Sequence, residues 1–183
     1  FTEANFRAVE LLEEFAKRID HTNLKPNADE KSILKTLEEG IEYNFRGVCI
    51  PPVYVSLAKR KLDDSDVKVI TVVGFPLGYI PKDIKVREAI VAEENGADEI
   101  DVVMNISYFK SGFKDRVLEE LKEIVRSVNI PVKVIIETSY LDPKEIETAS
   151  RIVEEAGAFC VKTNTGFGPR GVSLDDVKII RRS

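Results

Sequence analysis

The chain has 183 residues, of which 43% are hydrophobic and 32% charged, a balance typical of a globular protein with one well-packed core. Its 32 acidic and 27 basic residues are mixed along the chain and give a net charge of -5, so no basic stripe indicates a nucleic-acid partner. No apolar run approaches the roughly 20 residues of a membrane span, and no signal-peptide pattern opens the sequence. We therefore expect a cytoplasmic protein without membrane or nucleic-acid partners.

The first predicted element is an amphipathic helix over residues 3–17, with Phe6, Val9, Leu12 and Phe15 on one face. We expect this helix to cap one end of the fold. A short strand over residues 18–24 follows it and becomes polar at its end.

Strands and amphipathic helices then alternate along the chain. The predicted strands are residues 18–24, 47–50, 67–73, 99–104, 132–136 and 159–162. Asn27 and Glu30 predict the N-terminal cap of the helix after the first strand, and Ser173 predicts that of the last helix. Asp142 and Glu145 flank a first-turn proline and predict another helix start.

This alternation is typical of the α/β class, with a parallel sheet and right-handed crossovers. A complete (β/α)8 TIM barrel takes about 250 residues, so the chain accommodates about six βα units plus the N-terminal helix. An open six-stranded sheet is the alternative, but no nucleotide-binding glycine motif follows any strand. We predict a single barrel domain over residues 1–183 that lacks the last two βα units.

Polar and aromatic residues gather where the predicted strands end, which is the face that carries the active site in such barrels. These residues are Asp20, Thr22, Cys49, Phe75, Asp101, Asn105, Glu137, Thr138, Lys162 and Thr165. A solvated strand end explains any one of them, but six strands that all deliver such groups favour a site.

Lys162 ends an apolar strand and is followed by the polar residues 163–165 and a glycine-rich turn. One interpretation is a lysine that extends into solvent along apolar surface. The other is an amine nucleophile that forms a Schiff base, which requires surroundings that destabilise its ammonium form. Asp101 lies among apolar strand residues as an expected proton carrier, and we expect it to act on Lys162 through water rather than as a direct salt-bridge partner.

Three other features have weaker implications. Lys133 and Glu99 are predicted to form a buried pair beneath the site, from their alternation with Glu137 and Asp101. The only histidine, His21, is expected to stabilise a turn or to pack rather than to take part in catalysis. The glycine-rich turn over residues 166–171 is either a permissive loop or a place where backbone amides approach an anion.

Cys49 and Cys160 both lie in apolar, strand-like runs and lack metal-ligand spacing. We expect both to be reduced thiols in the core or lining the site.

The motifs at these positions resemble the deoxyribose-phosphate aldolases, a family of class I aldolases, over nearly the whole chain. The matching segments are residues 20–26, 47–49, 73–78, 96–103, 133–138 and 161–167. Six motifs in the same order make the resemblance highly specific.

The resemblance implies reversible cleavage of 2-deoxy-D-ribose 5-phosphate to acetaldehyde and D-glyceraldehyde 3-phosphate in deoxyribose phosphate catabolism, without a metal or organic cofactor. It implies that Lys162 is the Schiff-base lysine and Asp101 the proton-relay aspartate. It also implies a homo-oligomer, either a dimer or a tetramer. The residues that match substrate-pocket positions are Asp20, Thr22, Leu24, Cys49, Phe75, Thr165 and Gly166.

Two departures from the family pattern are visible. Asn164 stands where the family usually has serine or alanine, and the chain has neither the family's second lysine motif nor its last phosphate motif. Two alternatives therefore stay open: a catalytically inactive barrel fragment that binds sugar phosphate, and a related barrel aldolase for another phosphorylated aldehyde.

Overall fold

The structure, a computed structural model, describes residues 3–183, with side chains along the first helix described from residue 7 onward. The chain divides into two units. The first holds the residues up to 71 together with 95–98, and the second holds residues 72–94 and 99–183.

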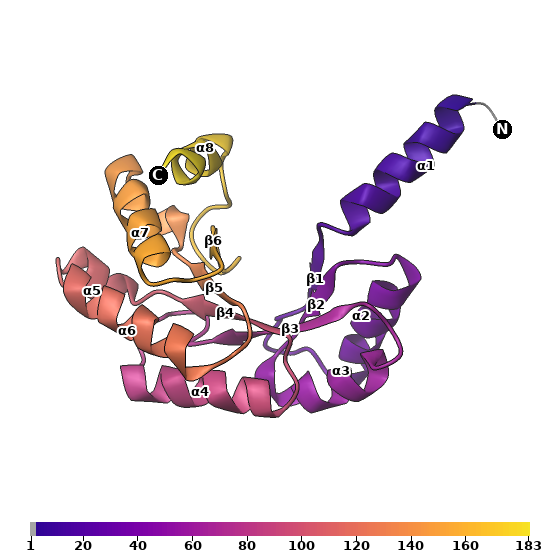
Figure 1. Cartoon of the computed structure of the whole chain (residues 1–183), viewed down its shortest axis with the longest axis horizontal. Helices are drawn as coiled ribbons and strands as arrows, with labels where there is room; N and C mark the ends of the chain where they lie inside the picture. The colour runs from indigo at the N-terminus through magenta and orange to yellow at the C-terminus, as the bar shows by residue number, and fades with distance from the viewer. Residues whose placement is uncertain (1–2) are drawn as a thin grey trace. The chain divides into compact units, whose positions relative to one another are not determined.

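The first unit contains the N-terminal helix and the first strands, drawn in indigo to magenta (Figure 1). Its elements are α1 (Glu3–Ala16), β1 (Asp20–Thr22), α2 (Glu30–Glu42), β2 (Gly47–Cys49), the 3-10 helix η1 (Pro52–Tyr54), α3 (Val55–Leu62) and the first part of β3 (Lys68–Val73). The strands are parallel, with Asp20 opposite Gly47 and Gly47 opposite Lys68.

The core of this unit forms between α2, α3 and the strands. Ile33 and Leu37 on α2 are buried with Val48 on β2 and Ala58 on α3, because the apolar positions of each helix recur on one face. The helix α1 forms where the sequence predicts it, but its apolar face remains accessible: Leu12 is 69% and Phe15 65% exposed.

The second unit contains the remaining strands and their helices. Its elements are the end of β3, α4 (Lys82–Glu94), β4 (Glu99–Val103), α5 (Ile106–Lys110), α6 (Lys114–Ser127), β5 (Val132–Ile135), the 3-10 helix η2 (Thr138–Tyr140), α7 (Pro143–Glu155), β6 (Cys160–Lys162) and α8 (Leu174–Arg182). β4 pairs with β5 and β5 with β6, again in parallel.

The helices α4, α6, α7 and α8 follow one another side by side in this unit (Figure 1). On α6 the buried residues Val117, Leu121 and Ile124 form a single apolar stripe. Every residue of β4 and β5 is buried. Strands of this kind are hydrophobic along their whole length, so the polar residues within them stand out.

The strand order is the chain order, β1-β2-β3-β4-β5-β6, and every pairing described above is parallel. Together with the intervening helices, this confirms the prediction of an α/β fold with six βα units. That the whole chain forms one domain stays a prediction.

Three predicted N-terminal helix caps can be compared with the structure. The capping boxes at Asp142 and Ser173 are both present. The predicted cap at Asn27 is wrong: α2 begins later, and Asp29 caps it by accepting a hydrogen bond from the backbone N–H of Ser32 at 2.9 Å. Within residues 3–183, no helix has both the length and the apolar character needed to cross a membrane.

Candidate active site

Lys162 is the last residue of β6, at the carboxyl end of the strand. Its carbonyl accepts a hydrogen bond of 3.1 Å from Ile136 N–H, which fixes the strand end against the end of β5. The lysine side chain is 29% exposed, so it is partly covered and partly open to solvent.

Asp101 lies in the middle of β4 and is fully buried. Its Oδ2 accepts a short hydrogen bond directly from Lys162 Nζ. Its Oδ1 lies 3.0 Å from Lys133 Nζ. The expectation that Asp101 reaches Lys162 only through water is therefore wrong: a buried carboxylate needs charged or hydrogen-bonding partners, and the two lysines supply them directly.

Lys133 also lies 3.3 Å from Glu99, so the predicted Lys133–Glu99 pair beneath the site is confirmed. The register explains the arrangement, because Lys133 on β5 stands opposite Asp101 on β4. The result is a row of alternating charges: Glu99, Lys133, Asp101 and Lys162. The Asp101 carboxylate is thus shared between two lysines, and the attraction between opposite charges favours this arrangement in the buried site.

Phe75 and the segment after Lys162 form a second part of the site. The ring of Phe75 packs edge-on against Phe167, with centroids 5.5 Å apart. The hydroxyl of Thr165 donates a hydrogen bond to Glu137, with 2.5 Å between Oγ1 and Oε2. Gly166 has a φ of 87°, and an added Cβ would meet no atom within 4 Å, so its backbone conformation, not crowding, favours glycine there.

The other four predicted substrate residues, Asp20, Thr22, Leu24 and Cys49, lie in the first unit. The register places Thr22 opposite Cys49, and Thr22 Oγ1 donates to the Asp20 carbonyl at 2.8 Å. Asp20 also pairs with Arg46, whose Nε lies 3.1 Å from Oδ1. The structure brings Asp20, Thr22 and Cys49 together on the paired strands β1 and β2, and Leu24 follows β1 by two residues. The role of all four toward a substrate stays a prediction.

His21 has the structural role expected for it. Its Nε2 lies 2.7 Å from Glu39 Oε2, and its ring packs at 5.1 Å from that of Phe45. The hydrogen bond to His21 lowers the pKa of Glu39. Cys49 is buried, as expected, whereas Cys160 at the start of β6 is exposed, so the expectation of a core position is wrong for Cys160.

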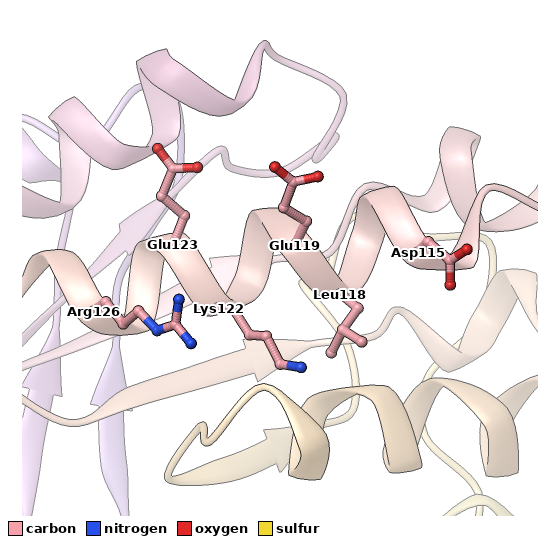
Figure 2. Close-up of a pocket in the computed structure, with 6 residues that line it drawn as sticks. All are labelled: Asp115, Leu118, Glu119, Lys122, Glu123 and Arg126. Carbon is pink, nitrogen blue, oxygen red and sulfur yellow. The ribbon is translucent and has the colours of Figure 1, made fainter.

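The described residues contain no group of three or more His, Cys, Asp or Glu side chains placed to hold a metal ion. A hollow lies along one side of α6 (Figure 2), and none of its lining residues belongs to the charged row. Its lining residues all come from that one helix: Asp115, Leu118, Glu119, Lys122, Glu123 and Arg126. Lys122 and Glu123 form ion pairs with Glu155 and Lys82 on the neighbouring helices, so these side chains serve helix packing.

Sequence reasoning missed two features of the site. It did not predict the bond between Lys133 and Asp101, although the alternation that suggested the Lys133–Glu99 pair also places Asp101 on the same face. It assigned no role to Glu137, which has a left-handed backbone with a φ of 55°. No local signal predicts that conformation at a glutamate.

Parallel strands in chain order, each followed by a helix, are the arrangement of (β/α)-barrel enzymes, whose active-site residues come from the ends of several strands. The chain belongs to the DeoC/LacD family of aldolases, whose family model matches residues 15–182. It is therefore an aldolase.

Relatives and solved structures agree with this assignment. The chain is 52% identical over 177 residues to the deoxyribose-phosphate aldolase of Caldanaerobacter subterraneus subsp. tengcongensis, covering 94% of this chain and 77% of that protein. It matches the solved structure of an aldolase called QR15 with a TM-score of 0.88 and 45% identity, covering 91% of this chain and 75% of that one. It matches the deoxyribose phosphate aldolase of Aeropyrum pernix, described as a unique tetramer, with a TM-score of 0.84 and 34% identity, covering 92% and 71%. These likenesses confirm the predicted barrel class.

Proposed function

We propose that this aldolase reversibly cleaves 2-deoxy-D-ribose 5-phosphate to acetaldehyde and D-glyceraldehyde 3-phosphate through a Schiff base on Lys162. The observation that carries the proposal is the direct hydrogen bond between Lys162 and the buried carboxylate of Asp101. This bond provides a path for the proton that must leave the lysine before its amine can react. The names of the relatives support the choice of substrate.

In this mechanism the neutral amine of Lys162 attacks the C1 aldehyde carbon of the open-chain sugar, and loss of water gives a protonated imine. Asp101 takes the proton of the C3 hydroxyl while the C2–C3 bond breaks. The electron pair of that bond enters the imine system, giving an enamine and free D-glyceraldehyde 3-phosphate. Protonation of the enamine carbon and hydrolysis release acetaldehyde and restore Lys162.

Lys133 and Glu99 support this cycle without touching the substrate. Because Lys133 engages one oxygen of Asp101, the other oxygen is directed at Lys162. Phe75, Thr165 and Gly166 belong to the substrate-binding part of the proposal, together with Asp20, Thr22, Leu24 and Cys49. We also propose that the enzyme is cytoplasmic, acts in deoxyribose phosphate catabolism and forms a homo-oligomer, for which the tetrameric Aeropyrum pernix relative is a precedent.

Borohydride trapping in the presence of acetaldehyde tests the mechanism. We expect one reduced adduct, located at Lys162 by peptide mass spectrometry, and none in Lys162→Arg. Labelling at any other lysine, or no labelling, would contradict the proposal.

Retro-aldol rates across phosphorylated aldehyde substrates test the specificity, since a faster rate with another sugar phosphate would favour a related barrel aldolase. A protein that binds the sugar phosphate without forming the adduct would instead be the inactive fragment. Light scattering measures the oligomeric state.

A further inference from the structure

Glu137 is a buried carboxylate at the end of β5 that the proposed reaction does not use. Its side chain is only 2% exposed, and its φ of 55° and ψ of 68° lie in the left-handed region. A glutamate rarely adopts this conformation, and residues held in it concentrate at functional sites. The position therefore calls for a reason beyond packing.

The backbone on both sides of Glu137 is tied to the segment that carries Lys162. Ile136 N–H donates to the Lys162 carbonyl at 3.1 Å, and Thr138 N–H donates to the Thr163 carbonyl at 3.0 Å. With its neighbours fixed in this way, Glu137 turns out of the regular strand. Its side chain reaches the residues that follow the lysine, as the next contacts show.

The carboxylate of Glu137 accepts hydrogen bonds from both donors of Thr165, its hydroxyl and its backbone N–H. Oε2 accepts from Thr165 Oγ1 at 2.5 Å, and Oε1 accepts from Thr165 N–H at 3.3 Å. Ser139 Oγ donates to the same Oε1 at 3.3 Å. A Cβ added at Gly168 would lie 2.3 Å from Ser139 Oγ and 3.1 Å from Glu137 Oε1, so the loop passes directly over this group and admits no side chain there.

Thr165, held by Glu137, in turn fixes the backbone of Phe167. Its Oγ1 accepts a hydrogen bond of 3.0 Å from Phe167 N–H, and the Phe167 ring packs edge-on against Phe75. The donors of Thr165 and the N–H of Phe167 are thus engaged within the loop. Gly166 and Gly168 beside them have no side chain, so an anion can approach the backbone amides there.

We infer that Glu137 is a positioning residue that acts through Thr165 to hold residues 163–168 in the conformation that receives the phosphate end of the substrate. The inference rests on the proposed function for its substrate. It predicts that loss of the Glu137–Thr165 bond weakens binding of the phosphate end and leaves the chemistry of Lys162 intact.

The test variant is Glu137→Asn in the complete protein. Asparagine tolerates the left-handed backbone but is one methylene shorter and uncharged, so it keeps the turn and loses the bond to Thr165. We expect the KM for 2-deoxyribose 5-phosphate to rise about tenfold, the effect of losing one charge-assisted hydrogen bond. Turnover of unphosphorylated 2-deoxyribose and borohydride trapping of acetaldehyde are expected to stay close to those of the unmodified protein.

Three further variants separate positioning from general stability. Glu137→Gln keeps an oxygen acceptor at full length and is expected to restore most of the affinity. Ser139→Ala removes the other side-chain donor to the same carboxylate and is expected to change the KM little. In Thr165→Val, adding Glu137→Asn is expected to have little further effect, because two residues that act through one contact are not additive.

The outcomes distinguish this inference from the proposed function. If the unmodified protein gives no adduct at Lys162, the proposed function fails. If the adduct forms but Glu137→Asn leaves the KM unchanged, or affects the phosphorylated and unphosphorylated sugars equally, the inference is overturned and the function stands. Should Glu137→Asn fail to fold by circular dichroism, Thr165→Val decides, since the same selective rise in KM is expected there and its absence overturns the inference.

Discussion

Asp101 is the residue on which both the charge balance and the proposed proton transfers depend. It accepts from Lys162 on one oxygen and faces Lys133 on the other. We expect Asp101→Asn to lower kcat of the retro-aldol reaction by about 10²- to 10⁴-fold, because an amide cannot accept the substrate proton. Steady-state kinetics measure this effect.

Glu99→Gln is the matched control for that variant. Glu99 pairs with Lys133 in the row of alternating charges, and it is almost as buried as Asp101. We therefore expect a much smaller fall in kcat. If both variants lost activity equally, Asp101 would be part of a structural charge network and not a proton carrier.

Asp176 gives a pH-dependent prediction for stability. Arg170 donates to it at 2.6 Å, and this bond, joined by those from Ser173 and Thr138, holds the pKa of Asp176 well below its usual range. The depressed folded-state pKa means that its stabilisation is complete above the unfolded pKa of about 3.9 and is lost as the pH falls toward the folded value.

We therefore expect Asp176→Asn to lower the free energy of unfolding by about 1–3 kcal/mol at pH 7. The difference from the unmodified protein should shrink steadily below about pH 4, where Asp176 begins to lose this advantage. Urea denaturation at a series of pH values measures it. A difference that stays constant down to pH 2 would show that the carboxylate charge is not responsible.

At the scale of elements, a buried ion pair joins α4 to α6 and to the end of β4. The ammonium of Lys85 is fully buried, lies 2.6 Å from Glu120 and donates to the Val103 carbonyl at 2.9 Å. Burial lowers the pKa of Lys85 and raises that of Glu120, while each partner opposes the effect on the other. The pair therefore holds three elements together and is sensitive to the loss of either member.

We expect Lys85→Met to lower the free energy of unfolding by about 3–5 kcal/mol, because Glu120 is left charged and buried. The double variant Lys85→Met with Glu120→Leu should recover most of this loss. Lys122→Met is the control: it removes a partly exposed pair with Glu155 and should cost at most about 1 kcal/mol. Thermal denaturation compares the three, and equal losses in both lysine variants would contradict the argument.

Elements were predictable where one residue type determines the geometry. Asp142 and Ser173 start helices because their side chains cap the N–H groups within the next turn. The predicted cap at Asn27 was wrong because Asp29, which lies closer to the apolar residues of α2, caps that helix instead. The five-residue helix α5 was missed, since a single turn is too short to show periodicity.

The sequence was enough to predict which residues belong to the site, but not how their side chains contact one another. Lys162 and Asp101 were found from polar groups at strand positions, whereas their direct hydrogen bond joins two residues 61 positions apart in the chain, on strands β4 and β6 with β5 between them. The turned-out backbone of Glu137 depends on the bonds of Ile136 and Thr138 to the next strand. Such contacts are set by register, which no window of sequence contains.

At the scale of the whole molecule, α1 contributes little burial. Nearly every described side chain along it is exposed, and together with Ile19, Tyr43 and Phe45 its apolar residues line an accessible groove. We expect deletion of residues 1–12 to change the free energy of unfolding by less than about 1 kcal/mol, because so little apolar surface leaves water. A loss above about 2 kcal/mol in urea denaturation would show that the groove is filled in solution.

The strand order that follows the chain order has a consequence for synthesis on the ribosome. Within each unit a strand pairs with the one made just before it, so no strand waits for a distant partner. As each helix and the next strand emerge, they find their docking surface already in place. The order in which the protein is made is thus also an order in which it can fold, because each new strand pairs with an edge that is already in place.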